Sequence, residues 1–295
     1  GWITVEHSLA TYRHIKGPIG FHTDLNFRGM WELSHAIHAF GAAAVVQLSI
    51  GLGAQFFRGR RPDVELVAPS PIPYNVPIGT VCRGLKSWEG TQGDIPRELT
   101  TQEVEELEDD FVQAALRIKR AGFDGIEIHG AHGYLLGAFI SPLSNRRSDK
   151  YGGSFEKRLT LPLNIYRKTR AAVGEDFILG FRISGDEHVK GGLTIEETCR
   201  IASILEKEGI DFIHLSSGRY ESLIHLFPDD EGVILPEAQA IKQAVEKAPV
   251  ICPNVHSPSL AEHALLEGMA DVISLSRGLI ADPDWPNKTR EGRET

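Results

Sequence analysis

Three features of the sequence predict an α/β fold of the TIM (β/α)8 barrel class. Short apolar runs alternate with amphipathic helical stretches, the order typical of parallel β-loop-α units. The apolar runs are nearly continuous, as expected for strands that are buried on both faces. Polar residues follow the carboxyl ends of many runs, and a barrel brings such ends to one face. Only seven runs are visible, so we expect the first of the eight strands to lie before Gly1.

The predicted strands and helices follow one another along the whole chain. The strands are Trp2–Glu6, Ala44–Leu48, Gly125–His129, Ile178–Ile183, Phe212–Ser216, Pro249–Pro253 and Val272–Ser276. The clearest helix is Thr101–Ala121, with Thr100 or Thr101 as its cap and Glu103 in its first turn. Further helices are expected at Phe155–Ala172, Thr194–Glu208, Leu235–Glu246 and Ser259–Leu266.

Glycines are expected to end three of these helices. Gly122, Gly209 and Gly268 each follow a predicted helix, and an aspartate comes two or three residues later. Glycine adopts the left-handed conformation that closes a helix, so each glycine predicts a helix end and a new strand.

The chain shows no second domain, and residues 1–295 are predicted to form a single barrel domain. Residues 49–100 contain many prolines and glycines without periodicity, which indicates a long loop at the active face. Ala39–Phe57 carries no charge, but its glycines and polar residues fit a buried strand and loop better than a membrane helix.

Composition narrows the functional classes. The chain has 31 basic and 40 acidic residues, a net charge of −9, which disfavours binding to nucleic acid or to anionic membranes. Its three cysteines are far apart, so they predict neither a disulfide framework nor a four-thiolate cluster. A reducing, cytoplasmic setting is the natural expectation.

The densest cluster of reactive side chains follows the third visible strand. His129, His132 and Tyr134 lie within six residues, between glycines. Neutral imidazoles can polarise a carbonyl group or hold an oxyanion, and a phenol can donate a proton. Two alternatives remain: both histidines bond buried backbone groups, or they ligate a metal ion together with residues such as Glu127 and His214.

Other polar residues at strand ends predict an anion-binding face. Gln47 and Arg182 come late in apolar strands, where buried polar groups need partners. The loops after the last two strands are the usual phosphate site of a barrel. The candidates there are Asn254, Ser276, Arg277 and Gly278.

These residues, together with several longer motifs, resemble the Old Yellow Enzyme family of FMN-dependent ene-reductases. The matching stretches are His129 to Leu136, Ser141-Pro142, Asn145 to Arg147, Asp149, Tyr151 to Ser154, Phe181 to Ser184, Gly191 to Thr194 and Arg277 to Trp285. The resemblance covers essentially the whole chain. Gln47-Leu48 and the glycine-rich turn after them resemble the branch of 2,4-dienoyl-CoA reductases, 2-enoate reductases and bile-acid-type enone reductases.

The resemblance implies a role for each candidate residue. Gln47 and Arg182 would contact the polar edge of the flavin, and Arg277 with the backbone around Asn254 and Gly278 would hold the FMN phosphate. His129 and His132 would bind the substrate oxygen. Tyr134 would protonate the α-carbon after flavin N5 gives hydride to the β-carbon. Substrate choice would depend on residues 49–100 and on the loop that holds Arg219, Tyr220, His225 and Phe227.

The chain also departs from the family pattern. His7 stands where a small residue beside the flavin is expected, and Gly137-Ala138 and Lys157 replace common polar residues. In the multidomain branch a [4Fe–4S] cysteine cluster follows the Asp-Pro-Asp-Trp helix, and then come flavin and pyridine-nucleotide domains. The chain stops at Thr295, about where that cluster would begin. The resemblance therefore implies truncation at both ends, although a natural product that ends here is the alternative.

The sequence thus predicts an NAD(P)H-dependent FMN oxidoreductase that reduces the C=C bond of an unsaturated carbonyl, enoate or enoyl-CoA. A [4Fe–4S] cluster and FAD would belong to a full-length protein, and a homo-oligomer is left open. The alternatives are a flavin dehydrogenase or demethylase of the same fold, a metal-dependent barrel lyase or hydrolase, and an inactive fragment with unpaired sheet edges.

Overall fold

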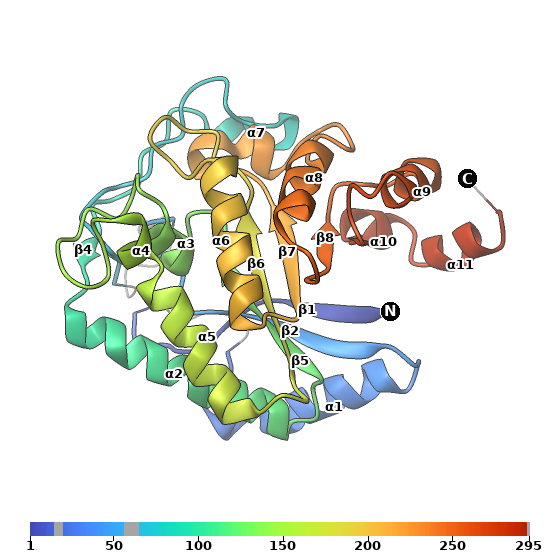
Figure 1. Ribbon diagram of the computed structural model, residues 1–295, viewed down its shortest axis with the longest axis horizontal. Coiled ribbons are helices and arrows are strands. Elements are labelled where there is room, and N and C mark those ends of the chain that lie inside the picture. The colour runs from blue at the N-terminus through green and yellow to red at the C-terminus, as the bar shows by residue number, and fades with distance from the viewer. Residues whose placement is uncertain (15–19, 56–64, 294–295) are drawn as a thin grey trace.

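A single parallel sheet organises the molecule. The computed structural model describes residues 1–14, 20–55 and 65–293. Seven parallel strands run in the order β1-β2-β5-β6-β7-β8-β9, so each pairs with the next strand of the sheet along the chain (Figure 1). They are β1 (Trp2–Leu9), β2 (Ala43–Ser49), β5 (Gly125–Gly130), β6 (Ile178–Ser184), β7 (Phe212–Ser216), β8 (Val250–Cys252) and β9 (Val272–Ile273). All seven predicted strands are confirmed, and no described strand pairs with the outer edges of β1 and β9.

Helices cover one face of this sheet (Figure 1). The main core packs between that face and the helices, around buried residues such as Val46, Ile128, Phe181 and Leu215. The helices are α1 (Phe27–His38), α2 (Thr101–Arg120), α3 (Leu135–Ile140), α4 (Phe155–Arg158), α5 (Thr160–Val173), α6 (Ile195–Glu208), α7 (Leu223–Leu226), α8 (Leu235–Ala244), α9 (Pro258–Leu266), α10 (Arg277–Ala281) and α11 (Trp285–Arg290).

The predicted helices form with small differences at their ends. Thr100 caps α2 and Glu103 completes a reciprocal capping box with it, as the sequence predicts. The single helix expected at 155–172 is instead two helices, α4 and α5, which meet at Leu159. The structure also contains α1, α3, α7 and α10, which the sequence did not predict, and α11 begins at Trp285 of the Asp-Pro-Asp-Trp motif.

The long segment 49–100 is more structured than predicted in its described part. Val67–Ala68 (β3) and Arg97–Glu98 (β4) form a small parallel ladder, and a short 3-10 helix covers Arg83–Trp88. Tyr74 and Val76 are buried in a satellite cluster with Leu223 of α7. This segment therefore packs against the loop that follows β7.

The glycine and aspartate junctions tie neighbouring strands together. Gly122, Gly209 and Gly268 have positive φ angles after α2, α6 and α9, which confirms the predicted helix ends. The aspartates that follow accept backbone N–H groups of the preceding sheet strand. Asp124 accepts from Ala44 at 2.7 Å, Asp211 from Leu179 at 2.7 Å and Asp271 from Val250 at 2.8 Å. Each carboxylate thus fixes the register of one strand pair.

The other face of the sheet is apolar near the starts of the strands and polar near their carboxyl ends. Alternate residues of a strand point to opposite faces. Near the strand starts the second face is apolar, because Val45, Phe212 and Ile251 pack together with Trp2 and Ile178. Further along the strands the same face carries polar residues. Among the described residues no helix is long and apolar enough to cross a membrane.

Candidate functional site

The strand register places the predicted flavin-edge residues beside two further polar residues. Gln47 of β2 is the register partner of Glu127 of β5, and Arg182 of β6 is the partner of His214 of β7. All four lie on the same face of the sheet as the apolar cluster of Val45 and Phe212. Gln47 comes two residues after Val45 and His214 two residues after Phe212, and Glu127 and Arg182 are their register partners. The sequence predicted Gln47 and Arg182, and it named Glu127 and His214 only as further ligands in the metal alternative.

These four side chains form one hydrogen-bonded network. Gln47 Nε2 donates to Glu127 Oε1 at 2.6 Å, and His214 Nδ1 lies 2.6 Å from Glu127 Oε2. His214 Nε2 lies 3.0 Å from Ser274 Oγ and 3.1 Å from Arg182 Nη1. Because a carboxylate only accepts, His214 donates from Nδ1 and accepts at Nε2.

The charges in this network balance. Burial by itself raises the pKa of Glu127, but His214, Arg182 and Gln47 together bring that pKa below its usual value. Burial and the nearby Arg182 lower the pKa of His214. The network therefore holds one carboxylate, one guanidinium and one neutral imidazole.

The predicted catalytic residues meet at the carboxyl end of β5. His129 is the last residue but one of the strand, His132 follows in the loop with a φ of 64°, and Tyr134 is the N-cap residue of α3. The ring centroids of His129 and His132 are 5.0 Å apart. The Tyr134 ring lies 5.2 Å from His129 and 5.8 Å from His132. The structure thus brings the three residues together as predicted.

Local hydrogen bonds orient both imidazoles. Ala131 N–H donates to His129 Nδ1 at 3.3 Å, so neutral His129 carries its proton on Nε2 and can donate it to a ligand. Ser184 Oγ accepts the backbone N–H of His132, and His132 Nε2 lies 2.6 Å from Ser216 Oγ. Burial lowers the pKa of both imidazoles well below the usual value. The nearby His132 lowers the pKa of His129 further, and the positive charge of Arg182 lowers that of His132. Both rings are therefore neutral at pH 7.

His7 of β1 is a fourth member of the ring cluster. Its ring centroid lies 5.2 Å from His129 and 5.3 Å from Tyr134. Burial lowers its pKa from 6.5 to about 4, and its Nε2 forms no hydrogen bond with a described residue. A small residue was expected at this position, and the imidazole narrows the space beside the cluster.

The loop after β7 completes the mouth of the site. Tyr220 Oη lies 3.5 Å from Tyr134 Oη, and burial raises the pKa of Tyr134. Arg219 is buried and pairs with Glu187 at 3.1 Å and with Glu221 at 2.6 Å. Tyr220 can therefore reach a ligand beside Tyr134, whereas the guanidinium of Arg219 is occupied in structural ion pairs.

The other two candidates in this loop lie further from the ring cluster. His225 stacks on His188 with ring centroids 3.7 Å apart, and the Phe227 side chain is 45 % exposed. Within the described residues, neither forms a hydrogen bond, an ion pair or a ring contact with the three predicted catalytic residues.

The predicted phosphate-binding residues follow β8 and β9. Asn254 has a φ of 64°, and its Nδ2 donates to the Asp230 carbonyl oxygen at 3.2 Å. Arg277 donates to the Pro228 carbonyl oxygen at 3.4 Å, so both residues adjoin the same short segment. Ser276 precedes α10 and is exposed, and Gly278 lies in the first turn of that helix.

Several of these groups have polar atoms that no described residue pairs with. Arg277 forms no ion pair with a described residue, which suits an anionic ligand. The buried atoms Arg182 Nε and Asn254 Oδ1 also have no partner among the described residues. The site therefore fits a ligand with a polar ring edge and a phosphate group, as FMN has.

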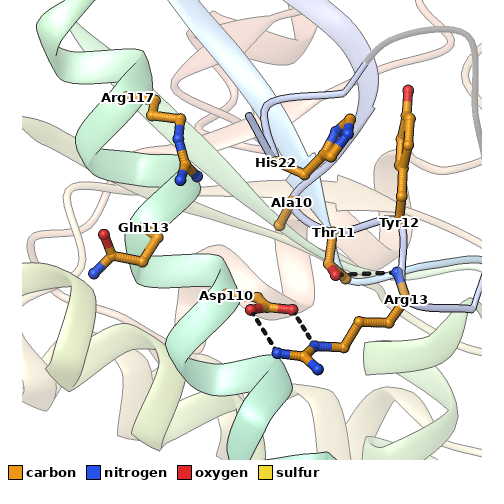
Figure 2. A pocket seen from close by; sticks show the side chains of 8 residues that line it. All are labelled: Ala10, Thr11, Tyr12, Arg13, His22, Asp110, Gln113 and Arg117. Atoms are coloured by element: carbon orange, nitrogen blue, oxygen red, sulfur yellow. Dashed lines mark hydrogen bonds and ion pairs between the residues drawn. The ribbon is translucent and has the colours of Figure 1, made fainter. Parts of the chain in front are cut away.

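A separate pocket of ≈ 320 Å³ lies between α2 and the loop after β1 (Figure 2). Its lining includes none of the predicted site residues. Arg13 in its wall pairs with Asp110, and Arg117 pairs with Asp24. Since its guanidinium groups are already paired, we assign no ligand to it. Within the described residues no three metal-ligating side chains cluster, so the metal-dependent alternative gains no ligand set there.

Comparison with known proteins agrees with this geometry. The chain is 42% identical over 300 residues to NADH oxidase of Thermoanaerobacter brockii, covering 100% of the chain and 44% of that relative. It is 34% identical to cinnamate reductase of Clostridium sporogenes, covering 94% of the chain and 41% of the relative. The old yellow enzyme homologue of Zymomonas mobilis superposes with a TM-score of 0.79 at 25% identity, over 99% of this chain and 80% of that one.

The chain thus spans less than half the length of these two relatives. The profile of the NADH:flavin oxidoreductase / NADH oxidase family matches residues 9–295. This match confirms the resemblance to the Old Yellow Enzyme family and the predicted barrel class of the fold. The chain belongs to the NADH:flavin oxidoreductase / NADH oxidase family.

Proposed function

We propose that this chain is the FMN-binding barrel of an NAD(P)H-dependent oxidoreductase that reduces the C=C bond of an α,β-unsaturated carbonyl compound. The observation that carries the proposal is the cluster of His129, His132 and Tyr134, whose ring centroids lie 5.0–5.8 Å apart at one strand end. The cinnamate reductase relative acts, by its name, on an unsaturated acid. Enoates and enoyl thioesters belong to the same proposed substrate class.

Bound FMN would supply the hydride, and Gln47, Arg182, Asn254, Ser276, Arg277 and Gly278 would hold it. The chain's own residues supply the polar part of the reaction. His129 Nε2–H donates a hydrogen bond to the substrate oxygen, with His132 beside it. Because both imidazoles are neutral, they polarise the carbonyl group as hydrogen-bond donors, and these bonds strengthen as negative charge develops on the oxygen.

Tyr134 is the proton donor for the α-carbon. Burial raises its pKa, so its phenol stays protonated across the neutral range. Tyr220 Oη, 3.5 Å away, stabilises the phenolate that remains after transfer. General acid catalysis of this kind contributes about 10²- to 10⁴-fold to a rate.

Cofactor uptake tests the function. Full-length protein reconstituted with FMN should show flavin absorption that bleaches with NAD(P)H and returns when an enone such as 2-cyclohexenone is added. Tyr134→Phe should slow the return about 10²-fold or more and leave the bleaching unchanged. Tyr166→Phe, which removes a phenol that donates to the Glu208 carbonyl oxygen far from the site, is the matched control.

Either of two results would contradict the proposal. Protein that takes up no flavin is not an FMN barrel. Equal rates of return in wild-type protein and Tyr134→Phe would remove the assigned proton donor but not the flavin chemistry.

We further propose that residues 1–295 form a single domain of a longer protein. The two relatives described above are more than twice as long as the part that this chain matches. In the longer protein a [4Fe–4S] cluster and FAD would pass electrons from NAD(P)H to the barrel. Iron and acid-labile sulfide analysis of the full-length protein tests this arrangement.

A further inference from the structure

Glu127 has no role in the function proposed above, yet it lies at the centre of the site. It is fully buried, and both carboxylate oxygens are used. Oε1 accepts from Gln47 Nε2, and Oε2 accepts from His214 Nδ1, each at 2.6 Å. A buried carboxylate is costly unless such partners hold it, so its contacts are expected to be persistent.

The contact with Glu127 decides which way the Gln47 amide faces. An amide group has a donating nitrogen and an accepting oxygen of nearly equal shape, and its orientation follows from its partners. A carboxylate can only accept, so the nitrogen of Gln47 must face Glu127. The carbonyl oxygen Oε1 is then directed away from Glu127 as a hydrogen-bond acceptor.

Arg182 presents the complementary group nearby. Its Nη1 lies 3.1 Å from His214 Nε2, while its buried Nε has no partner among the described residues. Gln47 and Arg182 therefore offer an acceptor and a donor to a ligand. The pyrimidine edge of a flavin has the matching pattern, because its N3–H donates and the adjacent carbonyl oxygens accept.

We propose that Glu127 is a positioning residue, which sets the Gln47 amide so that its oxygen accepts the N3–H of the flavin. This inference rests on the proposed flavin function and adds a residue to it. Without the carboxylate, the Gln47 amide is free to turn and to present its nitrogen, which does not match an N3–H. Glu127 thus acts on the ligand only through Gln47.

The test compares the binding of FMN and N3-methyl-FMN, which lacks that N–H group. Dissociation constants come from the quenching of flavin fluorescence, so the readout does not depend on activity. Wild-type protein should prefer FMN by about 10-fold or more, because the methyl compound leaves a buried acceptor unpaired. In Glu127→Gln that preference should fall at least about threefold. A glutamine side chain both donates and accepts, so it can pair with either the nitrogen or the oxygen of the Gln47 amide.

Two further variants complete the design. Glu127→Asp retracts the carboxylate from Gln47 by one methylene and should also lose at least about threefold of the preference, which serves if Glu127→Gln does not fold. Glu108→Gln is the matched control: Glu108 of α2 is also a buried glutamate, but its partners are Tyr151, Asn164 and Lys168. It should keep the wild-type preference.

Each outcome separates the proposals. Equal affinity of wild-type protein for the two flavins overturns the inference alone, as does an unchanged preference in a folded Glu127 variant. A preference that falls equally in Glu108→Gln also overturns it, because any lost buried carboxylate would then have the same effect. Binding of neither flavin overturns the flavin function and this inference with it.

Discussion

Replacing His7 with alanine should make the protein less sensitive to acid. Burial lowers the pKa of this imidazole from 6.5 to about 4 in the folded protein. The unfolded chain restores the ordinary pKa, so between pH 6.5 and 4 the unfolded state binds a proton that the folded state does not. The lowered pKa therefore leaves the free energy of unfolding unchanged above pH 6.5. Below pH 6.5 it decreases that free energy progressively as the pH falls. At about 1.4 kcal/mol per pH unit, the cost reaches about 2.5 kcal/mol at pH 4.5.

Thermal unfolding at pH 7.5 and pH 4.5 checks this value. Wild-type protein should lose about 2.5 kcal/mol more than His7→Ala between the two pH values, which corresponds to about 4 °C in Tm for a chain of this length. Any packing lost with the ring acts at both pH values and cancels in the comparison. Equal pH dependence of the two proteins would show that His7 is not protonated on unfolding in this range, and the reasoning would be refuted.

Three further substitutions probe other parts of the structure. Arg277→Ala should weaken FMN binding by about 10- to 100-fold, because charge-assisted bonds to phosphate are lost, but should leave riboflavin binding unchanged; equal weakening of both ligands would contradict the phosphate role. Gly180→Ala should destabilise the fold by about 1–3 kcal/mol in urea titrations, since its Cβ would lie 2.1 Å from the Phe212 ring; addition of Phe212→Leu should restore part of the loss. Glu187→Gln should cost about 3 kcal/mol by the same method, because it leaves buried Arg219 with one carboxylate instead of two; a loss under about 1 kcal/mol would show that Glu221 suffices.

The strands could be predicted from the sequence because buried parallel strands are nearly continuous apolar runs. The glycine helix ends were equally clear, since they depend on local conformation alone. In contrast, α1 was missed: Gly29 in its first turn disfavours a helix, and its buried residues are only Met30 and the polar Ser34. The single helix expected at 155–172 was wrong because Pro162, in the first turn of α5, has no N–H to bond the Arg158 carbonyl, so one helix cannot continue through Leu159.

The candidate site could be predicted only where its residues cluster in the chain. His129, His132 and Tyr134 stand within six residues and were found for that reason. Glu127 lies 80 residues from Gln47 and 87 from His214, so only the strand register reveals their contact. The tautomers also follow from backbone geometry, as the bond from Ala131 N–H to His129 Nδ1 shows.

The aspartates that fix strand register also indicate where this chain tolerates being cut. Asp124, Asp211 and Asp271 each join a helix end to the start of the preceding sheet strand. A cut between a glycine such as Gly209 and the aspartate after it would place the two paired strands in different fragments. The fragments would then separate at the hydrogen bond that fixes the register of the pair. Cuts at the carboxyl ends of β5 or β7 leave all three contacts inside intact β-α-β units. Split-protein reporters and circular permutants of this barrel should therefore be opened after β5 or β7, on the face that carries the site.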